Sequence, residues 1–325
     1  MYIVTGGAGF IGSAFVWKLN QLGIDQILVV DNLGSGDKWL NLRGLRYLDY
    51  LHKDDFIDLV LEDELRGRIE GIVHMGACSS TTEMDVEYLL ANNYKYTRVL
   101  AEYSLRKGIR FVYASSAATY GDGAFGYSDD HSLIEKFKPL NPYGYSKQLF
   151  DLWALRTGAL DKIAGLKFFN VYGPNEYHKG DMRSMVHKAW GQAQNSGAVK
   201  LFKSYRQEFS DGGQQRDFVY VKDCLDVIWW LLGKPAVNGI FNLGSGKAQS
   251  WNELVSAVFA SLGQEKKIEY IEMPEILRPQ YQYFTQAEMN KLNAAGCPVQ
   301  FTSLDKGVAD YVKGHLCKVD PRLSA

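Results

Sequence analysis

The sequence predicts an α/β protein with a Rossmann-type, doubly wound parallel sheet and a smaller C-terminal α/β lobe. In roughly the first half of the chain, short apolar runs alternate with longer segments of helical period, and such alternation is typical of βαβ units. Three glycines follow the first apolar run directly, at intervals of three residues. After about residue 175 the alternation loosens and polar loops separate shorter elements, which indicates the second lobe.

The apolar runs are rich in Val, Ile and Phe, as expected of strands covered on both faces. We expect strands at 2–5, 26–31, 71–77, 110–116 and 164–170, and helices at 10–22, 85–107 and 142–160. Later in the chain, the strand-like runs are KLF, DFVYV, GIFNLG and KIEYI, and the helix candidates are 222–233, 250–262 and 302–313. Ser250 and Glu253 have the spacing of a capping box, which predicts a helix start there.

Composition and charge exclude several classes of protein. The chain carries 36 basic and 37 acidic side chains, so no overall field favours nucleic acid or an anionic membrane. Four scattered cysteines form no CxxC pair and have no histidine at ligand spacing, which argues against a metal site or a disulfide framework and fits a reducing cytosol. No run approaches the roughly 20 apolar residues of a membrane helix, and the N-terminus lacks a signal-peptide pattern. We therefore expect a cytoplasmic protein with a small-molecule partner.

The first chemical motif is the glycine pattern in YIVTGGAGFIGSAF, where Gly6, Gly9 and Gly12 lie between a strand and a helix. Such glycines allow a tight turn, a close approach of a diphosphate to the backbone amides, and tight packing of helix on strand. The next strand ends in Asp31, about 20 residues on, where a carboxylate can bind an adenosine ribose. The pattern indicates a dinucleotide site.

The residues after Asp31 leave the choice of dinucleotide open. A carboxylate at this position favours NAD, because its charge repels a ribose phosphate. Asn32 follows Asp31 directly, Lys38 lies close behind it, and Lys53 lies a little further on. Two lysines can neutralise a 2′-phosphate, so both NADP and NAD fit.

The second motif is NPYGYSKQLFD, residues 141–151, which offers two tyrosines and one lysine. On a helix, residues four apart share a face and residues two apart do not, so Tyr143 and not Tyr145 reaches Lys147. Hydride transfer from a secondary alcohol needs its proton removed, and a tyrosine is a poor base for this unless a neighbouring cation stabilises its phenolate. Ser116, at the end of the strand RFVYASS, is placed to hydrogen-bond the reacting oxygen. The set predicts hydride-transfer chemistry.

Together these motifs resemble the extended short-chain dehydrogenases/reductases, the NAD-dependent epimerase/dehydratase group that acts on nucleotide-sugars. Further stretches are similar to the ADP-heptose 6-epimerase branch of that family: GACSSTTE, NNYKYT, YASSAATYGD, FFNVYGPNEYHKGDM, RDFVYVKD, GIFNLGSGKA and FTQAEMNKLNAAG. The likeness extends to about residue 315, and the last residues, KVDPRLSA, carry none of it.

The resemblance implies an epimerase for ADP-heptose with one tightly bound NADP per subunit, in a homo-oligomer such as a pentamer. Carbon six is oxidised to a carbonyl and reduced from the opposite face, which requires a second acid/base group. The family's second group corresponds to Lys179, which completes a catalytic set with Ser116, Tyr143 and Lys147. The remaining cofactor contacts that the resemblance implies are Phe10, Ile11, Met75, Ala77, Ser79, Asn92 and Val171.

The implied substrate contacts are Ser116, Asn170, Asp181, Lys188, Phe202, Arg206, Arg216 and Tyr281. Arg216 suits a diphosphate because of its forked donors, although an ion pair with Asp217 or Asp223 is an equal alternative. The sequence departs from the family pattern at Met75, where an acidic residue is usual, and at Asp181 and Lys188. The loop 203–215 is longer than in some relatives, so Arg206 is a second candidate for the diphosphate.

On this basis we assign residues 1–170 to a dinucleotide-binding Rossmann domain and 171–325 mainly to a substrate-binding lobe. Whether the runs at 217–221 and 239–243 rejoin the first sheet stays open. A 4,6-dehydratase is disfavoured because SAATYG lacks that family's acidic pair. A hexose 4-epimerase does not explain Lys179, and a non-catalytic dinucleotide sensor does not explain the Ser116, Tyr143 and Lys147 set.

Overall fold

The computed structural model describes the backbone of residues 1–325, and the side chains of all but residues 276, 279 and 280. Its strands are β1 (Tyr2–Thr5), β2 (Ile27–Asp31), β3 (Asp49–His52), β4 (Gly71–His74), β5 (Arg110–Ser116), β6 (Ala164–Phe168), β7 (Asn170–Tyr172), β8 (Val199–Phe202), β9 (Gln215–Tyr220), β10 (Gly239–Leu243), β11 (Ala248–Ser250) and β12 (Ile268–Ile271). Its helices are α1 (Phe10–Gln21), α2 (Lys53–Leu61), α3 (Val86–Leu89), α4 (Tyr96–Lys107), α5 (Pro142–Arg156), α6 (Met185–Ser196), α7 (Val221–Leu232), α8 (Trp251–Leu262), α9 (Asn290–Ala294) and α10 (Leu304–Tyr311).

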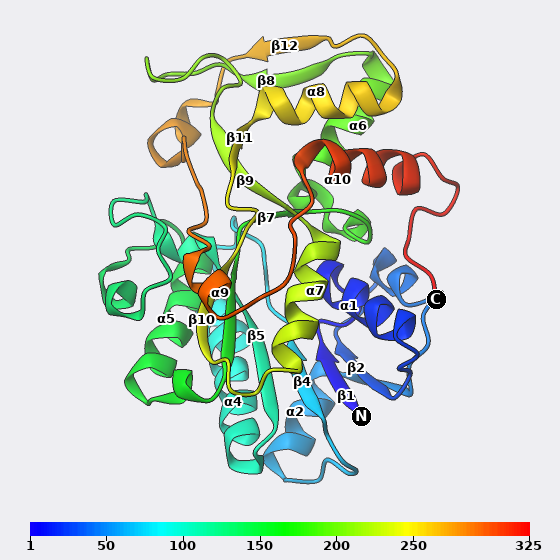
Figure 1. The fold of residues 1–325 in the computed structure, drawn as a ribbon, viewed down its shortest axis with the longest axis vertical. Coiled ribbons are helices and arrows are strands. Elements are labelled where there is room, and N and C mark those ends of the chain that lie inside the picture. Colours follow the sequence, from blue (N-terminus) through cyan, green and yellow to red (C-terminus); the bar gives the residue numbers. More distant parts are fainter.

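A seven-stranded sheet forms the larger part of the molecule (Figure 1). The strand order is β10-β6-β5-β4-β1-β2-β3, and every neighbouring pair is parallel. The direction of winding reverses between β1 and β4, which is where open α/β sheets bind ligands, beyond the carboxyl ends of the strands. The predicted Rossmann-type, doubly wound parallel sheet is confirmed.

Helices cover both faces of this sheet. Helices α1 and α7 pack together on one face, and α2, α4 and α5 lie on the other (Figure 1). All five residues of β2, ILVVD, are consequently buried. Burial on both faces explains why the strands read as continuous apolar runs in the sequence.

Most predicted strands are present, with two informative differences. The run at 164–170 divides, since β6 ends at Phe168 and β7, which begins at Asn170, belongs to a different sheet. The edge strand β3 was missed, because its residues DYLH are half-exposed or exposed and form no apolar run. The expected helix at 85–107 is interrupted by a π-helical turn, Leu90–Lys95, between α3 and α4.

The smaller lobe contains a three-stranded sheet, in the order β11-β9-β7, and the parallel pair β12-β8. It is packed with α6, α8 and α10 in the upper part of Figure 1. Of the two runs left open by the sequence, 239–243 joins the large sheet as β10, whereas 217–221 lies largely in β9 and does not. Helix α8 begins with the predicted capping box of Ser250 and Glu253.

The last residues of the chain pack against the part of the molecule that contains the seven-stranded sheet. The Leu323 amide donates to Asn175 Oδ1 at 3.0 Å, and Tyr177 Oη donates to the Pro321 carbonyl at 2.8 Å. Trp17 of α1 donates to the Ser324 carbonyl at 3.1 Å. The terminus therefore lies beside α1, as Figure 1 shows. None of the helices within the described chain is at once long and apolar enough to span a bilayer.

Candidate active site

A cleft of about 1060 Å³ follows the carboxyl ends of β1, β4, β5 and β6 and is closed on its other side by residues of the second lobe. A smaller cavity adjoins it at the end of β2. The two share Gly6, Asp31, Lys38, Gly76, Ala77 and Cys78. Together they form one elongated site, suited to a long ligand that bends over the sheet edge.

The glycine turn between β1 and α1 leaves no room for side chains. Gly6 has a φ of +64°, and a Cβ there would lie 2.6 Å from the Gly76 nitrogen. A Cβ on Gly12 would lie 2.0 Å from the Gly6 oxygen. Helix α1 begins beyond Gly9 without a side-chain cap, so its first amides are free to bind an anion. The turn fits the diphosphate of a dinucleotide.

Asp31 is buried at the end of β2. Its carboxylate accepts hydrogen bonds from the amides of Ala8, at 2.8 Å, and Asn32, at 2.7 Å, and it pairs with Lys38. Lys53 lines the same small cavity and pairs with Asp54 at 2.8 Å. The cavity thus offers a carboxylate for a ribose hydroxyl and two ammonium groups for a phosphate, which fits an adenosine moiety.

The other residues predicted to contact the cofactor also line these two spaces. They lie at the start of α1, on the loops after β2 and β4, in the π-helical turn Leu90–Lys95, and on β7. Phe10, Ile11, Met75, Ala77, Ser79 and Val171 line the cleft, and Asn32, Asn92 and again Ala77 line the smaller cavity.

Helix α5 delivers Tyr143 and Lys147 to the cleft. The helix starts at Pro142, and the Asn141 side chain caps it by accepting from the Gly144 amide at 2.7 Å. Tyr143 and Lys147 line the cleft, whereas Tyr145 is 45% exposed and does not. The structure therefore brings together the tyrosine and lysine that are four residues apart.

Burial shapes the protonation of both groups. It raises the pKa of Tyr143, while a hydrogen bond with Ser116 acts in the opposite direction. Burial lowers the pKa of Lys147 to about 8, and the negative charge of Asp151 and the Cys78 thiol oppose that shift. The Lys147 ammonium donates to the Ala114 carbonyl at 2.8 Å. Both side chains line the same cleft, and a cation that approaches the Tyr143 hydroxyl would stabilise the phenolate needed for proton abstraction from an alcohol.

The second predicted acid/base group, Lys179, enters the cleft from a different element. It belongs to the segment 175–184, which we call the Lys179 segment and which follows β7. Its ammonium nitrogen lies 5.2 Å from the centroid of the Phe10 ring. Burial lowers the pKa of Lys179, and the neighbouring Glu176 partly offsets this. A lowered pKa suits a lysine that must release and accept a proton.

The Lys179 segment is short and is held by side chains. Glu176 accepts from the Ser184 hydroxyl at 2.6 Å. Asn175, fully buried, donates to Ser13 Oγ on α1 at 2.9 Å and accepts from the Leu323 amide. Residues of α1 and of the chain's last turn therefore fix the position of Lys179.

The predicted substrate residues fall into two groups. Asn170, Lys188 and Tyr281 line the cleft together with Ser116. Arg206 and Asp181 are exposed and do not line it, and the Arg206 guanidinium lies 4.5 Å from the centroid of the Tyr283 ring.

Arg216 is buried directly behind Tyr281, with its guanidinium 5.3 Å from the centroid of that ring. It forms no ion pair among the described side chains. Asp217 instead accepts from the Ser245 hydroxyl at 2.7 Å, and Asp223 from Thr302. The alternative role of Arg216 in an ion pair is therefore wrong. Phe202 lies 6.3 Å from Tyr281, ring to ring.

Sequence reasoning missed several residues that build the site. Asn93 holds the loop after β4, accepting from the Cys78 amide at 2.8 Å and donating to Ser146 Oγ on α5 at 3.0 Å. Trp251 lines the cleft and donates to Tyr281 Oη at 3.0 Å. Their signals in the sequence were weak, since an Asn within a helix and a Trp after a strand have many ordinary roles.

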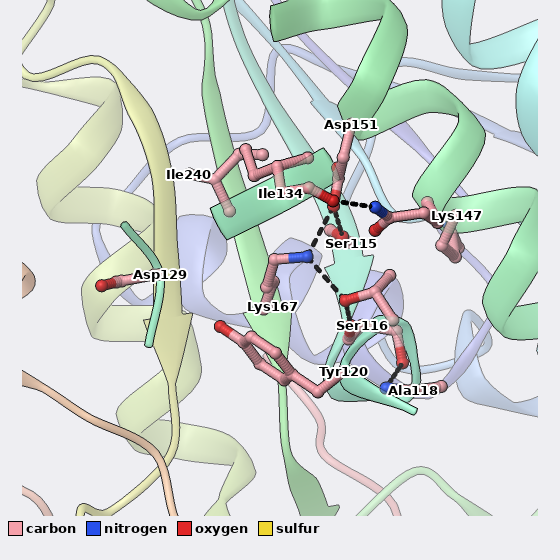
Figure 2. A network of polar contacts seen from close by, with 12 residues as sticks. Ser115, Ser116, Ala118, Tyr120, Asp129, Ile134, Lys147, Asp151, Lys167 and Ile240 are labelled. Carbon is pink, nitrogen blue, oxygen red and sulfur yellow. Dashed lines mark hydrogen bonds and ion pairs between the residues drawn. The ribbon is translucent and has the colours of Figure 1, made fainter. Parts of the chain in front are cut away.

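The buried pair of Asp151 and Lys167 was missed as well. Asp151 lies on α5 and Lys167 on β6, and their charged atoms are 2.7 Å apart. Figure 2 shows the two side chains pointing toward each other. The available signal was the spacing, because Asp151 follows Lys147 by four residues and so lies on the same helix face.

The comparisons with known proteins agree with this geometry. The profile described as "NAD dependent epimerase/dehydratase family" matches residues 2–244. An ADP-L-glycero-D-manno-heptose-6-epimerase from Nitratidesulfovibrio vulgaris (Hildenborough) is 60% identical over 323 residues, which cover 99% of this chain and 100% of the relative.

Two solved structures share the fold. The crystal structure of ADP-L-glycero-D-manno-heptose-6-epimerase from Helicobacter pylori is 28% identical with a TM-score of 0.81, and the match covers 96% of this chain and 95% of the other. That of UDP-glucose 4-epimerase from Thermus thermophilus, in complex with NAD, is 25% identical with a TM-score of 0.72, and covers 96% and 97%.

Proposed function

The chain belongs to the NAD dependent epimerase/dehydratase family, and we propose that it inverts carbon six of ADP-D-glycero-D-manno-heptose to give the ADP-L-glycero-D-manno-heptose used for the inner core of lipopolysaccharide. The observation that carries this proposal is the entry of Tyr143 and Lys179 into one cleft from two different elements. The 60% identity to a heptose 6-epimerase over the whole chain supports the same substrate.

A nicotinamide dinucleotide is the family's cofactor, and the glycine turn and the cavity at Asp31 fit it. When bound, the dinucleotide supplies the acceptor and donor of a hydride. We infer that it is NADP, with NAD as the alternative, held tightly with one per subunit. Lys38 supports this choice, because it already neutralises Asp31 and so reduces the repulsion of a 2′-phosphate.

The groups on the sheet side of the cleft remove the first proton. Tyr143 takes the proton of the hydroxyl at carbon six, and the Lys147 ammonium stabilises the resulting phenolate. Ser116 hydrogen-bonds the same oxygen and holds it against Tyr143. These are the roles that the Tyr143–Ser116 contact and the burial of Lys147 support.

Inversion requires a second group on the opposite side of the sugar. Lys179 fills that role, since it faces the cleft from the Lys179 segment and its burial lowers its pKa. The sugar turns over as a carbonyl between the two groups and is reduced on its other face. A single base returns the original configuration.

The nucleotide end of the substrate extends toward the second lobe. Tyr281 and Phe202 there offer an aromatic surface. Arg216 carries a positive charge that pairs with no carboxylate among the described side chains, which suits a diphosphate. Asn170 and Lys188, in the cleft, are the candidates for the sugar hydroxyls. Contacts from Phe202, Arg216, Arg206 and Asp181 stay predictions, because none of these four side chains lines the cleft itself.

Three further predictions go with this function. We expect a homo-oligomer, with a pentamer as the arrangement that the family resemblance suggests. We expect the protein in the cytoplasm. We also retain the division into a dinucleotide-binding domain, 1–170, and a mainly substrate-binding lobe, 171–325, with β10 contributed back to the first.

Incubating the purified protein with ADP-D-glycero-D-manno-heptose, followed by analysis of the configuration at carbon six, tests the proposal. We expect a mixture of the two epimers without added dinucleotide. Tyr143→Phe serves as the inactive control. Unchanged starting material with the wild-type protein, together with turnover of UDP-glucose, would instead identify a hexose 4-epimerase.

A further inference from the structure

The ion pair of Asp151 and Lys167 lies directly beneath the catalytic groups. Both side chains are 0% exposed, and their charged atoms are 2.7 Å apart (Figure 2). Asp151 also accepts from Ser115 Oγ at 2.7 Å and from Tyr113 Oη at 3.0 Å. The carboxylate is thus fixed by three donors from two strands.

A buried ion pair is a poor source of stability. The free energy of removing two charges from water offsets most of their mutual attraction, so an apolar pair of similar volume often stabilises a protein equally well or better. We therefore look for the role of this pair in the residues that it contacts. Through these residues the pair is connected to Lys147 and Ser116.

Asp151 is connected to the catalytic lysine through α5. Tyr143, Lys147 and Asp151 follow one another at intervals of four residues and share one face of the helix. Lys147 donates to the carbonyl of Ala114, the residue before Ser115, which donates to Asp151. The carboxylate and the ammonium are therefore tied to adjacent residues of β5.

Lys167 is connected to the catalytic serine. Its ammonium donates to Thr119 Oγ1 at 2.6 Å, and Thr119 Oγ1 donates to the Ser116 carbonyl at 2.8 Å. The turn after Ser116 is further closed by the Ala118 amide, which donates to Ser116 Oγ at 3.1 Å. Lys167 thereby fixes the turn that orients the Ser116 hydroxyl (Figure 2).

We propose that Asp151 and Lys167 are positioning residues: Asp151 keeps Lys147 charged in its buried place, and Lys167 holds both Asp151 and the Ser116 turn. The proposal rests on the function assigned above to Lys147 and Ser116. It adds two residues from outside the cleft to the machinery of proton transfer.

The proposal predicts the direction in which each charge shifts the pKa of Lys147. Burial lowers the pKa of Lys147 to about 8, and Asp151 pulls it up. Because Lys147 acts as a cation, activity is lost as pH rises through its pKa. Removing the charge of Asp151 therefore moves the alkaline loss of activity to lower pH, and removing the charge of Lys167 while keeping Asp151 moves it to higher pH.

Other titratable groups near this cluster leave the sign unchanged. His74, from β4, and His131, from the turn after Asp130, have pKa values lowered by burial to about 3 and about 4, so both are neutral across the alkaline range. Burial raises the pKa of Tyr113 and Tyr120, so neither ionises there. Other titratable groups that act on these residues include Tyr143, the Cys78 thiol, Asp129, Asp130, Glu288 and Lys291, and none of them is altered in the variants below.

Two variants test the proposal with opposite expected signs. In Asp151→Asn/Lys167→Met both charges are removed together, so no unpaired charge is left buried. Its kcat should fall about 10-fold. The alkaline limb of its kcat profile should move down, because Asp151 is the charge of this pair that raises the pKa of Lys147 and the loss of Lys167 offsets only part of that change. In Lys167→Gln the amide can still donate to Asp151 and Thr119, and the limb should move up.

Arg110→Met is the matched control for loss of stability. Arg110 is a buried cation at the start of β5 that donates to the Leu231 carbonyl at 3.0 Å, away from α5. Its thermal midpoint should fall while its kcat profile stays that of the wild type. The KM for the substrate should be nearly unchanged in all three variants, since none of these residues lines the cleft.

A direct measurement separates this proposal from the proposed function. The side-chain ¹⁵N resonance of Lys147, assigned by its loss in Lys147→Arg, reports the pKa of that group without any turnover. Opposite shifts in the two variants support the role of the pair, even for a protein that does not act on ADP-heptose. Shifts of the Lys147 pKa in the same direction in both variants, or wild-type kcat profiles in both, would overturn the proposal. If one variant fails to fold, the sign of the shift in the other variant decides.

Discussion

The two sides of the cleft hold the two proposed proton-transfer groups, Tyr143 and Lys179, by different means. Tyr143 lies in the first turn of the long helix α5, which is capped by Asn141 and anchored through Lys147 to β5. Lys179 lies in a short 3-10 turn, Tyr177–Met182, that contains Gly180 at a φ of +52°. The first group is held by regular secondary structure and the second by a few buried side chains.

This difference indicates how each group does its work. The helix fixes Tyr143 against Ser116 and Lys147, as a site that must align one oxygen requires. The Lys179 segment depends on Asn175, Glu176 and the last turn of the chain for its position. We expect the helix side to be sensitive to loss of single catalytic atoms and the Lys179 side also to changes in its supports.

Loss of the Tyr143 hydroxyl should have the largest effect. Tyr143→Phe keeps the ring and its packing, and removes only the group that transfers the proton. The epimerisation rate should fall by roughly 10²–10⁴ or more, with thermal stability little changed. Tyr145→Phe is the matched control and should be mild, because that ring is 45% exposed outside the cleft. A crippled Tyr145 variant would show that the assignment of helix faces is wrong.

Loss of the Lys179 ammonium should have the second-largest effect on the epimerisation rate. Lys179→Met retains the aliphatic stem and removes the ammonium, which is both the proposed proton-transfer group and the atom that lies over the Phe10 ring. Epimerisation should fall by a similar factor, roughly 10²–10⁴. The control is Lys200→Met, which changes an exposed lysine on β8. If Lys179→Met epimerises at the wild-type rate, the second base must be sought elsewhere in the cleft.

Weakening the supports of the Lys179 segment should cost less. Asn175→Gly preserves the φ of +77° and removes a fully buried side chain that bonds Ser13 and Leu323. We expect a loss of stability of about 2 kcal/mol and an epimerisation rate about 10-fold lower. Asn20→Ala is the control: Asn20 is a buried Asn of α1 bonded to Ile24 and Arg46, so it should lose stability alone. Equal rates in the two variants would argue against a supporting role of Asn175.

The smallest change should come at the adenosine end, which neither proton-transfer group touches. Lys38→Ala removes the cation beside Asp31 and should weaken retention of NADP more than retention of NAD. Denaturing the purified wild-type protein and identifying the released nucleotide by mass checks the starting point, and NADP is expected. Release of NAD alone, with retention of NADP unaffected in Lys38→Ala, would contradict the NADP assignment.

The sequence predicted the parts of the molecule that local rules determine. The strands around Val4, Val29 and Val112 are apolar because both faces of the sheet are covered. The four-residue spacing of Tyr143 and Lys147 is a property of any helix. The strand β3 was not predicted, because an edge strand does not need a run of apolar residues.

Long-range contacts could not be predicted in this way. Lys167 looks in the sequence like any lysine in a strand, and only the fold brings it to Asp151. Lys179 was identified through the family resemblance alone, since its 3-10 turn has no periodic pattern. Arg206 and Arg216 are similar candidates by charge, yet only Arg216 is buried next to a ring that lines the cleft.

The most direct test of two proton-transfer groups uses a substrate analogue with an aldehyde at carbon six. Its disproportionation to acid and alcohol needs only one functioning base, so it proceeds wherever either Tyr143 or Lys179 is intact. Tyr143→Phe and Lys179→Met should each retain part of this activity while neither epimerises ADP-heptose, and the double variant should have none. Loss of disproportionation in only one single variant, with wild-type activity in the other, would contradict the account, because it would leave a single base in the cleft.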